Sequence, residues 1–322
     1  MDWGLANKLA ATVLPIAAAT AGGYAARKLR LLPERAAEYL MTWVMVCGYP
    51  AVGLLSIWAT KLKAADIWLP ALLGAHVILM VGVGMGLARI FTRDRAEAGL
   101  LAIAAALGNT GTTMGGFVVY QLYGEAGLGR VAVLGLAWMP VIVLVLYPIA
   151  RHHSQQASPA PLGRLILRSV FHWRSVGLPV TAAAIALSVL GVPRPQAVAD
   201  YHVLDLLIFL VMVAAYFSIG LRLHVSGIWP FRKCVAALAA MRFAGGWLVG
   251  LGLIAMTHLT GRPLTGMGRD VVMIESFVPT AVTMAAMANM FHLKPREASV
   301  LFVTNTALYM AAVLPLVFWL FG

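Results

Sequence analysis

The chain has 322 residues, of which 61% are hydrophobic and 11% charged, and its mean hydropathy is +0.86. Soluble domains carry roughly 25% charged residues, so the composition excludes an ordinary soluble domain and predicts a helical membrane protein. The net charge of +12 could suit nucleic acid. However, the basic residues lie at the ends of apolar runs, where they orient a protein in a bilayer, so we expect lipid and no nucleic acid as a partner.

Ten apolar runs are long enough to cross a bilayer, which takes about 20 helical residues. The runs are continuous rather than alternating, which excludes a membrane β-barrel. The sequence therefore predicts an all-α membrane protein of ten transmembrane helices. In chain order the expected spans are 8–26, 36–60, 67–89, 98–123, 129–150, 174–192, 201–221, 233–258, 270–292 and 297–320.

Basic residues are distributed unevenly between the two sides of these spans. With the N-terminus outside, all but eight of the 24 Lys and Arg residues fall on the inner side. Arg242 lies within a span, and the outer residues are Lys8, Lys61, Lys63, Arg130, Arg194, Arg262 and Arg269. This excess predicts an integral protein of the cell (inner) membrane with both termini outside.

The fourth span is apolar at both ends and polar in its middle. Glycine costs a helix interior roughly 1 kcal/mol relative to alanine, and freed backbone groups in hydrocarbon must be satisfied by protein or a watery cavity. We therefore expect a discontinuous helix at a substrate site, and the alternative is a continuous helix whose small residues allow close packing. The polar centre reads Gly108-Asn109-Thr110-Gly111-Thr112-Thr113-Met114-Gly115-Gly116.

Prolines recur at matching places in the two halves of the chain. Pro15 and Pro179 lie early in spans one and six, and Pro148 and Pro315 lie late in spans five and ten. We interpret the pattern as two repeats of five spans. Because five is odd, the second repeat is inverted relative to the first.

The repeats give a division into three segments. Residues 1–150 form the first repeat and residues 174–322 the second. Residues 151–173 are a cytoplasmic linker that turns amphipathic from Leu162 and is expected to lie at the membrane interface.

The ninth span then occupies the slot of the fourth. Pro279 removes a backbone donor and breaks or kinks a helix at a cost of about 3 kcal/mol. Ser276, Thr280 and Thr283 can satisfy the backbone groups that are freed. Two interrupted spans in matching slots are the best sequence indication of a midplane binding site.

Several short motifs resemble the auxin efflux carrier family of the bile acid/sodium symporter-like superfamily, which includes plant PIN-type carriers and bacterial carriers of dicarboxylates such as malonate. The resemblance implies ten helices in an inverted repeat, two broken helices that cross near the membrane centre, and a scaffold unit and a transport unit that move relative to each other. The family usually has a proline after Asn-Thr-Gly, where this chain has Gly115-Gly116. The resembling motifs are Leu14-Pro15, Gly23-Tyr24, Leu31-Leu32-Pro33-Glu34, Asn109-Thr110-Gly111, Tyr123-Gly124-Glu125-Ala126-Gly127-Leu128, Ser218-Ile219-Gly220-Leu221, Glu275 through Ala281, Ala298-Ser299 and Leu314-Pro315.

The two interruptions suit an anion. Half-helices that begin near Gly116 and Thr280 would present free N–H groups and about half a positive charge each, which favours a carboxylate. The candidate substrate-binding residues surround these points. They are Asn109, Thr110, Thr112, Thr113, Gly115, Gly116, Ser276, Pro279, Thr280 and Thr283.

Glu275 and Arg242 are candidates for coupling or for a charge pair. Intramembrane acids are functional hypotheses by default, so Glu275 either carries a proton or forms a structural pair near the outer end of its span. Arg242 is its natural partner, or else a counter-charge for the substrate. We expect no metal site and no cofactor. Since no dense carboxylate cage for sodium occurs, proton coupling or uniport is favoured over sodium coupling.

Together these features predict a secondary transporter that moves a small carboxylate-type organic anion by alternating access. A sodium-coupled symporter of the bile-acid type is the first alternative, and a channel or a structural membrane protein also stays open. An intramembrane enzyme is disfavoured because neither His-Glu-x-x-His nor Gly-x-Ser-x-Gly occurs. The sequence leaves a homodimer open.

Overall fold

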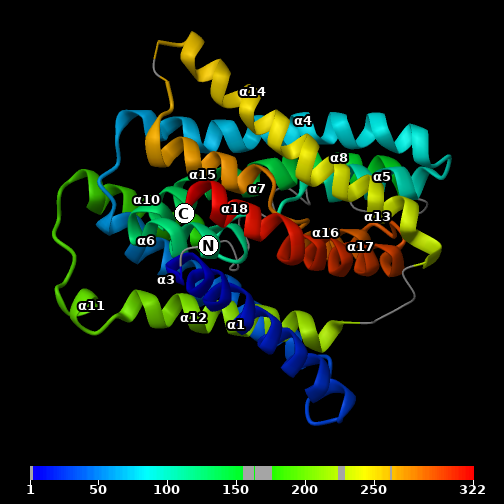
Figure 1. Ribbon diagram of the computed structural model, residues 1–322, viewed down its shortest axis with the longest axis horizontal. Coiled ribbons are helices and arrows are strands. Elements are labelled where there is room, and N and C mark those ends of the chain that lie inside the picture. Colours follow the sequence, from blue (N-terminus) through cyan, green and yellow to red (C-terminus); the bar gives the residue numbers. More distant parts are fainter. Residues whose placement is uncertain (1–2, 155–162, 164–175, 224–228, 262) are drawn as a thin grey trace.

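The computed structural model describes residues 3–154, 163, 176–223, 229–261 and 263–322, and this part of the chain is helical (Figure 1). Seven helical segments within it are long and apolar enough to cross a membrane. The protein is therefore an all-α integral membrane protein. The seven segments are Ala6–Lys28, Ala36–Ala59, Ala64–Phe91, Gly115–His153, Val203–Arg222, Arg232–Leu259 and Pro295–Phe321.

In the first half of the chain, one long segment contains a turn. Gly124 has φ 61° and ψ −152° within α6, a conformation that only glycine adopts readily. The turn lies where the sequence separates its fourth and fifth spans. The elements are α1 (Trp3–Lys28), α2 (Ala36–Trp43), η1 (Val44–Gly48), α3 (Tyr49–Ala59), η2 (Ala64–Ile67), α4 (Trp68–Phe91), α5 (Arg95–Ala106), α6 (Gly115–Leu134), η3 (Gly135–Ala137), α7 (Trp138–Val141), η4 (Ile142–Leu146) and α8 (Tyr147–His153).

In the second half, the helices of two expected spans are short. The helix within 174–192 has 13 residues, and 270–292 is divided between two helices. The predicted amphipathic part of the linker lies almost wholly outside the described residues. The elements are α10 (Gly177–Val189), α11 (Ala197–Asp200), α12 (Val203–Arg222), η6 (Trp229–Phe231), α13 (Arg232–Ala239), η7 (Ala240–Gly245), α14 (Gly246–Leu259), α15 (Gly266–Ser276), α16 (Val282–Met290), α17 (Pro295–Leu308), η8 (Tyr309–Val313) and α18 (Leu314–Phe321).

Two groups of helices lie on opposite sides of the molecule, and the helices within each group pack against one another. In Figure 1, α1 and α12 lie together along one side of the molecule, and α4, α13 and α14 lie on the other. A Cβ atom on Gly23 of α1 would lie 2.9 Å from the Leu221 nitrogen, and one on Gly220 of α12 would lie 2.9 Å from the Tyr24 nitrogen. Each glycine thus lets the backbone of the other helix approach closely, as small residues do between membrane helices.

Three of the prolines explain local widening of the helices. Pro50, Pro148 and Pro315 each follow a π-helical segment, η1, η4 and η8 respectively. Proline cannot donate to the carbonyl four residues earlier, and its ring clashes with that carbonyl. The helix accommodates this with one wider turn, which lets the span continue through the proline.

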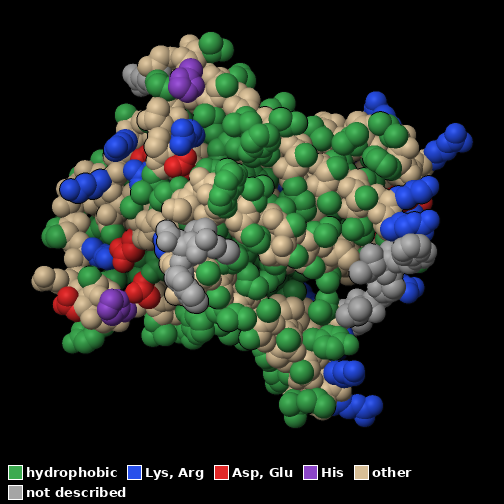
Figure 2. All heavy atoms as spheres, viewed as in Figure 1, with side chains coloured by type: hydrophobic (Ala, Val, Ile, Leu, Met, Phe, Trp, Pro, Cys, Tyr) green, Lys and Arg blue, Asp and Glu red, His purple; other side chains and the backbone are tan. Residues whose placement is uncertain are grey.

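Charge is distributed unequally between the two ends of the molecule. Figure 2 shows mostly Lys and Arg side chains at one end, on the right, whereas the opposite end carries both signs. We call the first the basic end. There Lys294 bridges α5 and α17, with its Nζ 2.9 Å from Asp94, 3.4 Å from Glu97 and 3.6 Å from Glu297.

We expect Lys294→Met to lower the free energy of unfolding by about 1 kcal/mol at neutral pH, because it leaves three carboxylates facing one another. The hydrogen bond from Lys294 holds the pKa of Asp94 below its usual range. The stability that Asp94 contributes is therefore complete above a pH of about 4 and is lost as the pH falls further. Thermal unfolding in detergent should show that the variant has a lower Tm than the parent at neutral pH, and that this difference in Tm becomes smaller in acid. Lys61→Met, at an exposed lysine, is the control, and a difference independent of pH would contradict the prediction.

Candidate functional site

Two helices end where glycine or proline interrupts the apolar sequence. Helix α5 ends at Ala106 and α6 begins at Gly115, while α15 ends at Ser276 and α16 begins at Val282. Gly111 has φ 81°, which favours glycine, and Pro279 cannot donate a backbone hydrogen bond. Eight residues in the first case and five in the second therefore lie outside regular helix, and backbone groups that lack helical partners there must be satisfied by other groups.

The two non-helical segments satisfy part of this need by pairing with each other. The Asn109 nitrogen donates to the Pro279 oxygen at 2.6 Å, and the Ala281 nitrogen donates to the Leu107 oxygen at 2.8 Å. Gly108 and Thr280 thus form an antiparallel β-bridge. We call this contact the crossing.

Arg242, in the π-helical segment η7, supplies donors to the carbonyl groups at the crossing. Its side chain is fully buried. Nη1 donates to the Ala105 oxygen at 2.8 Å, and Nε and Nη2 donate to the Val278 oxygen at 3.0 and 2.6 Å. Nη2 also lies 3.5 Å from the Ser276 oxygen. One guanidinium therefore satisfies carbonyls at the C-terminal ends of both α5 and α15.

Glu275 lies in the last turn of α15 and is 2% exposed. Neither of its carboxyl oxygens has a side-chain hydrogen-bond partner among the described residues, and the backbone N–H of Gly111 is the donor that interacts with the carboxyl group. A Cβ atom on Gly115, the first residue of α6, would lie 2.5 Å from the Glu275 carboxyl carbon. The carboxyl group therefore lies against the start of α6, and only glycine leaves room for it there.

The sequence paired Glu275 with Arg242, and the two are close enough to interact through space. The donors of Arg242 nevertheless point to backbone carbonyls. This arrangement leaves the acid without a side-chain hydrogen-bond partner.

Asn109 anchors a polar network on the other side of the crossing. Its Oδ1 accepts from Thr113 Oγ1 at 2.5 Å, and its Nδ2 donates to Tyr216 Oη of α12 at 3.3 Å. Tyr49 interacts with Thr113 in turn. The network links the crossing to α3, which carries Tyr49, and to α12, which packs against α1.

Other predicted residues have more local roles. Gly115 and Gly116 donate their N–H groups to the oxygens of Asn109 and Gly111 at 3.1 and 2.5 Å, so these two donors at the start of α6 are already engaged. Ser276 Oγ donates to the Met273 oxygen of its own helix at 2.7 Å. Thr112 and Thr283 are half-buried.

Asn305, Tyr216 and Tyr309 belong to the site but were not singled out from the sequence. Asn305 Oδ1 accepts from the Thr280 nitrogen at 2.8 Å. Buried polar atoms without a hydrogen-bond partner in the described residues include Asn305 Nδ2, Tyr309 Oη and Thr110 Oγ1. A polar Thr-Asn-Thr run at 304–306 inside an apolar span was the available signal.

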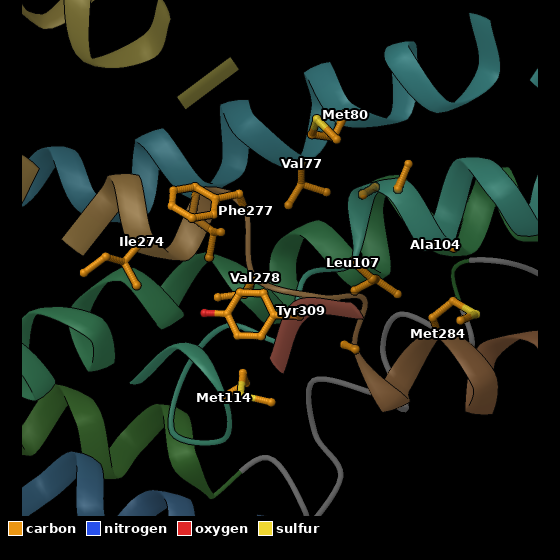
Figure 3. Close-up of a cluster of buried hydrophobic side chains, with 14 of the residues drawn as sticks. Val77, Met80, Ala104, Leu107, Met114, Ile274, Phe277, Val278, Met284 and Tyr309 are labelled. Carbon is orange, nitrogen blue, oxygen red and sulfur yellow. The ribbon is translucent and has the colours of Figure 1, made fainter. Parts of the chain in front are cut away.

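Apolar side chains enclose the crossing. Figure 3 shows Leu107, Val278 and Tyr309 close together, with Val77 and Met80 of α4 above them in the view, and all five residues are buried. This dry surrounding strengthens every electrostatic interaction at the crossing.

A cavity of about 780 Å³ lies at the basic end, between α1, α12, α16 and α17. Its charged lining residues are Arg27, Arg222, Arg296 and Glu34, and Asn289 and Ser299 also line it. It extends to Val282, the first residue of α16. A cavity whose lining carries more arginine than acidic side chains therefore leads to the beginning of a helix at the crossing.

A second cavity of about 320 Å³ lies on the other side, against Thr110, Gly111 and Thr112 of the first interruption. It is lined mainly by apolar and aromatic groups, including Tyr49 and Trp138.

Beyond this cavity, toward the mixed-charge end, the helices are tied together. Arg194 lies 2.9 Å from Glu125, and Ser188 donates to the Thr60 oxygen at 2.6 Å. A Cβ atom on Gly129 would lie 2.8 Å from the Ser56 oxygen of α3. The two ends of the molecule thus differ, with a large cavity at the basic end and close packing at the other.

Comparison with known families gives one match that spans nearly the whole chain. The family model described as "Membrane transport protein" matches residues 9–320. This match confirms the resemblance to auxin efflux carriers seen in the sequence motifs. No curated protein matches the chain.

Proposed function

Because the chain belongs to the membrane transport protein family of auxin efflux carriers, we propose that it is a secondary transporter of a small organic anion. The anion, of the carboxylate type, binds near the crossing and moves by alternating access. The observation that carries the proposal is the arginine-lined cavity of about 780 Å³ that reaches the start of α16.

An inverted repeat with two interrupted spans accounts for the arrangement of the helices. In this reading α5 with the start of α6 forms the fourth span, and α15 with α16 forms the ninth. Span one (α1) packs closely against span seven (α12), and span six (α10) packs closely against span two, which contains α3. Under the repeat, span one corresponds to span six and span seven to span two. A two-fold axis through the crossing would exchange the two pairs.

The electrostatics of the larger cavity favour an anion. Three arginines at its wall, Arg27, Arg222 and Arg296, outnumber its one acidic lining residue, Glu34. This excess of positive charge raises the local concentration of negative solutes. At its inner end, the start of α16 contributes the partial positive charge of a helix N-terminus. A carboxylate is the commonest small anion that both features suit.

The difference in packing between the two ends indicates the side of the membrane to which the cavity opens. By the positive-inside rule the basic end faces the cytoplasm, so both termini lie outside. The cavity opens at that end, and the Arg194–Glu125 pair and the Gly129 contact close the other. In the alternative state these closing contacts would separate and the smaller cavity beside Thr110 would open outward.

Glu275 is the residue that we assign to coupling. Its carboxyl group is buried beside the crossing and has no side-chain hydrogen-bond partner in the described residues. Arg242 of η7 and Tyr309 of η8 interact with it through space, and His76 of α4 lies near Arg242, with its Nε2 3.3 Å from the Gly246 oxygen. A carboxyl group in such a place binds and releases a proton when the surrounding helices move.

The test is exchange of labelled carboxylates by purified protein in proteoliposomes. A carrier shows saturable counterflow, which a channel does not. We expect Arg296→Gln to weaken the apparent affinity for the transported carboxylate about fivefold, since a charge in a cavity mouth is worth on the order of 1 kcal/mol. Raising the salt concentration should reduce the difference between variant and parent.

Arg93→Gln is the matched control, because Arg93 lies at the same basic end but does not line the cavity. Equal affinities of the Arg296→Gln variant and its parent at low salt would remove the cavity from the substrate path. The absence of counterflow for every carboxylate tested would reject the function itself.

A further inference from the structure

Arg242 places a positive charge at a point where backbone carbonyl groups from two helix ends converge. Its guanidinium lies between the C-terminal ends of α5 and α15, where carbonyls of Ala105, Ser276 and Val278 converge on it. In carriers with interrupted helices, such carbonyl ends and unwound segments commonly coordinate a coupling cation. Here the converging carbonyls bind a cation that belongs to the chain.

The charges at this point balance without a metal ion. Each helix C-terminus carries about half a negative charge, so the two ends together offset about one positive charge. Arg242 supplies that charge in a fully buried position.

Gly108 shows that the space is shaped for the guanidinium. A Cβ atom on Gly108 would lie 2.5 Å from Nη2 and 3.3 Å from Cζ of Arg242. The backbone of the first interruption therefore passes directly against the charged group. Any side chain at this position would displace the guanidinium from the carbonyls.

We propose that Arg242 is a tethered cation that permanently occupies the place of a coupling metal ion between α5 and α15, so that neither Na⁺ nor K⁺ takes part in transport by this protein. A tethered charge cannot leave with the substrate. It holds the two interrupted segments together throughout the cycle. The statement about transport rests on the proposed function, whereas the statement about the cation site does not.

The first experiment measures thermal unfolding in detergent, with no transport involved. Arg242→Ala vacates the site, and we expect about 10 mM guanidinium or Na⁺ to raise the Tm of this variant by a few degrees, because a ligand of the folded state stabilises it by mass action. Wild type should not respond to either ion. Choline chloride controls for ionic strength, and Arg269→Ala, which removes an exposed arginine, controls for the loss of a charge.

A folded Arg242→Ala variant that responds to neither ion would overturn the proposal, as would a rise in the Tm of wild type with Na⁺. If Arg242→Ala does not fold, Gly108→Ala gives a second test. In a wild-type background it should lower the Tm by several degrees, and in an Arg242→Lys background by much less, because the narrower ammonium group leaves room for the methyl group. Equal losses in the two backgrounds would count against the proposal.

The second experiment measures carboxylate counterflow with all Na⁺ and K⁺ replaced by choline. Wild type should retain its full rate, and a fall of tenfold or more would overturn the proposal. If no carboxylate exchanges in any medium, the proposed function fails while the unfolding experiment still decides the role of Arg242.

Discussion

Replacing Gly115 with alanine should reduce carboxylate transport about tenfold. The added methyl carbon would lie 2.5 Å from the carboxyl carbon of Glu275 and closer still to one of its oxygens. Overpacking of this kind costs about 1–3 kcal/mol, and 1.4 kcal/mol corresponds to a factor of ten. The strain falls on the contact between α15 and the start of α6. The measurement is the initial rate of counterflow in proteoliposomes, normalised to the amount of folded protein.

Gly82→Ala is the matched control, because no atom lies within 4 Å of a Cβ atom there, and the variant should transport at the parental rate. Glu275→Ala should relieve the strain. The fall in Tm of the double variant Gly115→Ala/Glu275→Ala should therefore be smaller than the sum of the falls in Tm of the two single variants. Strict additivity of the two losses would show that the side chains do not meet.

Glu275→Gln should abolish accumulation driven by a pH gradient while leaving counterflow in place. Glutamine keeps the size of the side chain but cannot bind and release a proton near neutral pH. For one proton per substrate, a gradient of one pH unit supports about tenfold accumulation in the parent. The variant should equilibrate its substrate without concentrating it. The measurement is uptake into proteoliposomes under an imposed pH gradient, with the membrane potential clamped.

The infrared spectrum provides a readout that does not depend on transport. The C=O stretching band of a protonated carboxylic acid should change with pH in the parent and lose that component in Glu275→Gln. Asp205→Asn is a suitable control, because Asp205 is an exposed carboxylate away from the crossing and forms hydrogen bonds with Tyr120 and His202. Undiminished accumulation by Glu275→Gln would remove Glu275 from coupling.

Much of the fold was predictable because the bilayer and the backbone impose local requirements. Continuous apolar runs with few charges can only be membrane helices, and the structure confirms an all-α chain with long apolar segments. Glycine at a positive φ explains the turn at Gly124. The end of α5 before Gly108 and the start of α16 after Pro279 likewise follow from residues that cannot sustain a helix.

The site was less predictable because its contacts join residues far apart in the chain. Arg242 was visible in the sequence as a charge inside a span, but Glu275 seemed its natural partner. Only the packing of η7 against both interruptions directs it to the carbonyls of Ala105 and Val278. A sequence pattern consists of residue types and their spacing. Because every residue has a backbone carbonyl group, the sequence does not indicate which carbonyl accepts a hydrogen bond from a given side chain.

The sequence by itself determined that this protein is a helical membrane transport protein, that glycine and proline lie where α5 and α15 end, and that basic residues gather on one side, because hydropathy, glycine, proline and charge act locally. The tertiary structure alone decided that Tyr216 and Asn305 join the crossing, that Glu275 is left without a side-chain hydrogen-bond partner, and that a cavity opens at the basic end. These features depend on how helices from both halves pack. The energies that decide that packing come from contacts between residues more than a hundred positions apart, such as Asn109 with Tyr216 and Arg242 with Ala105.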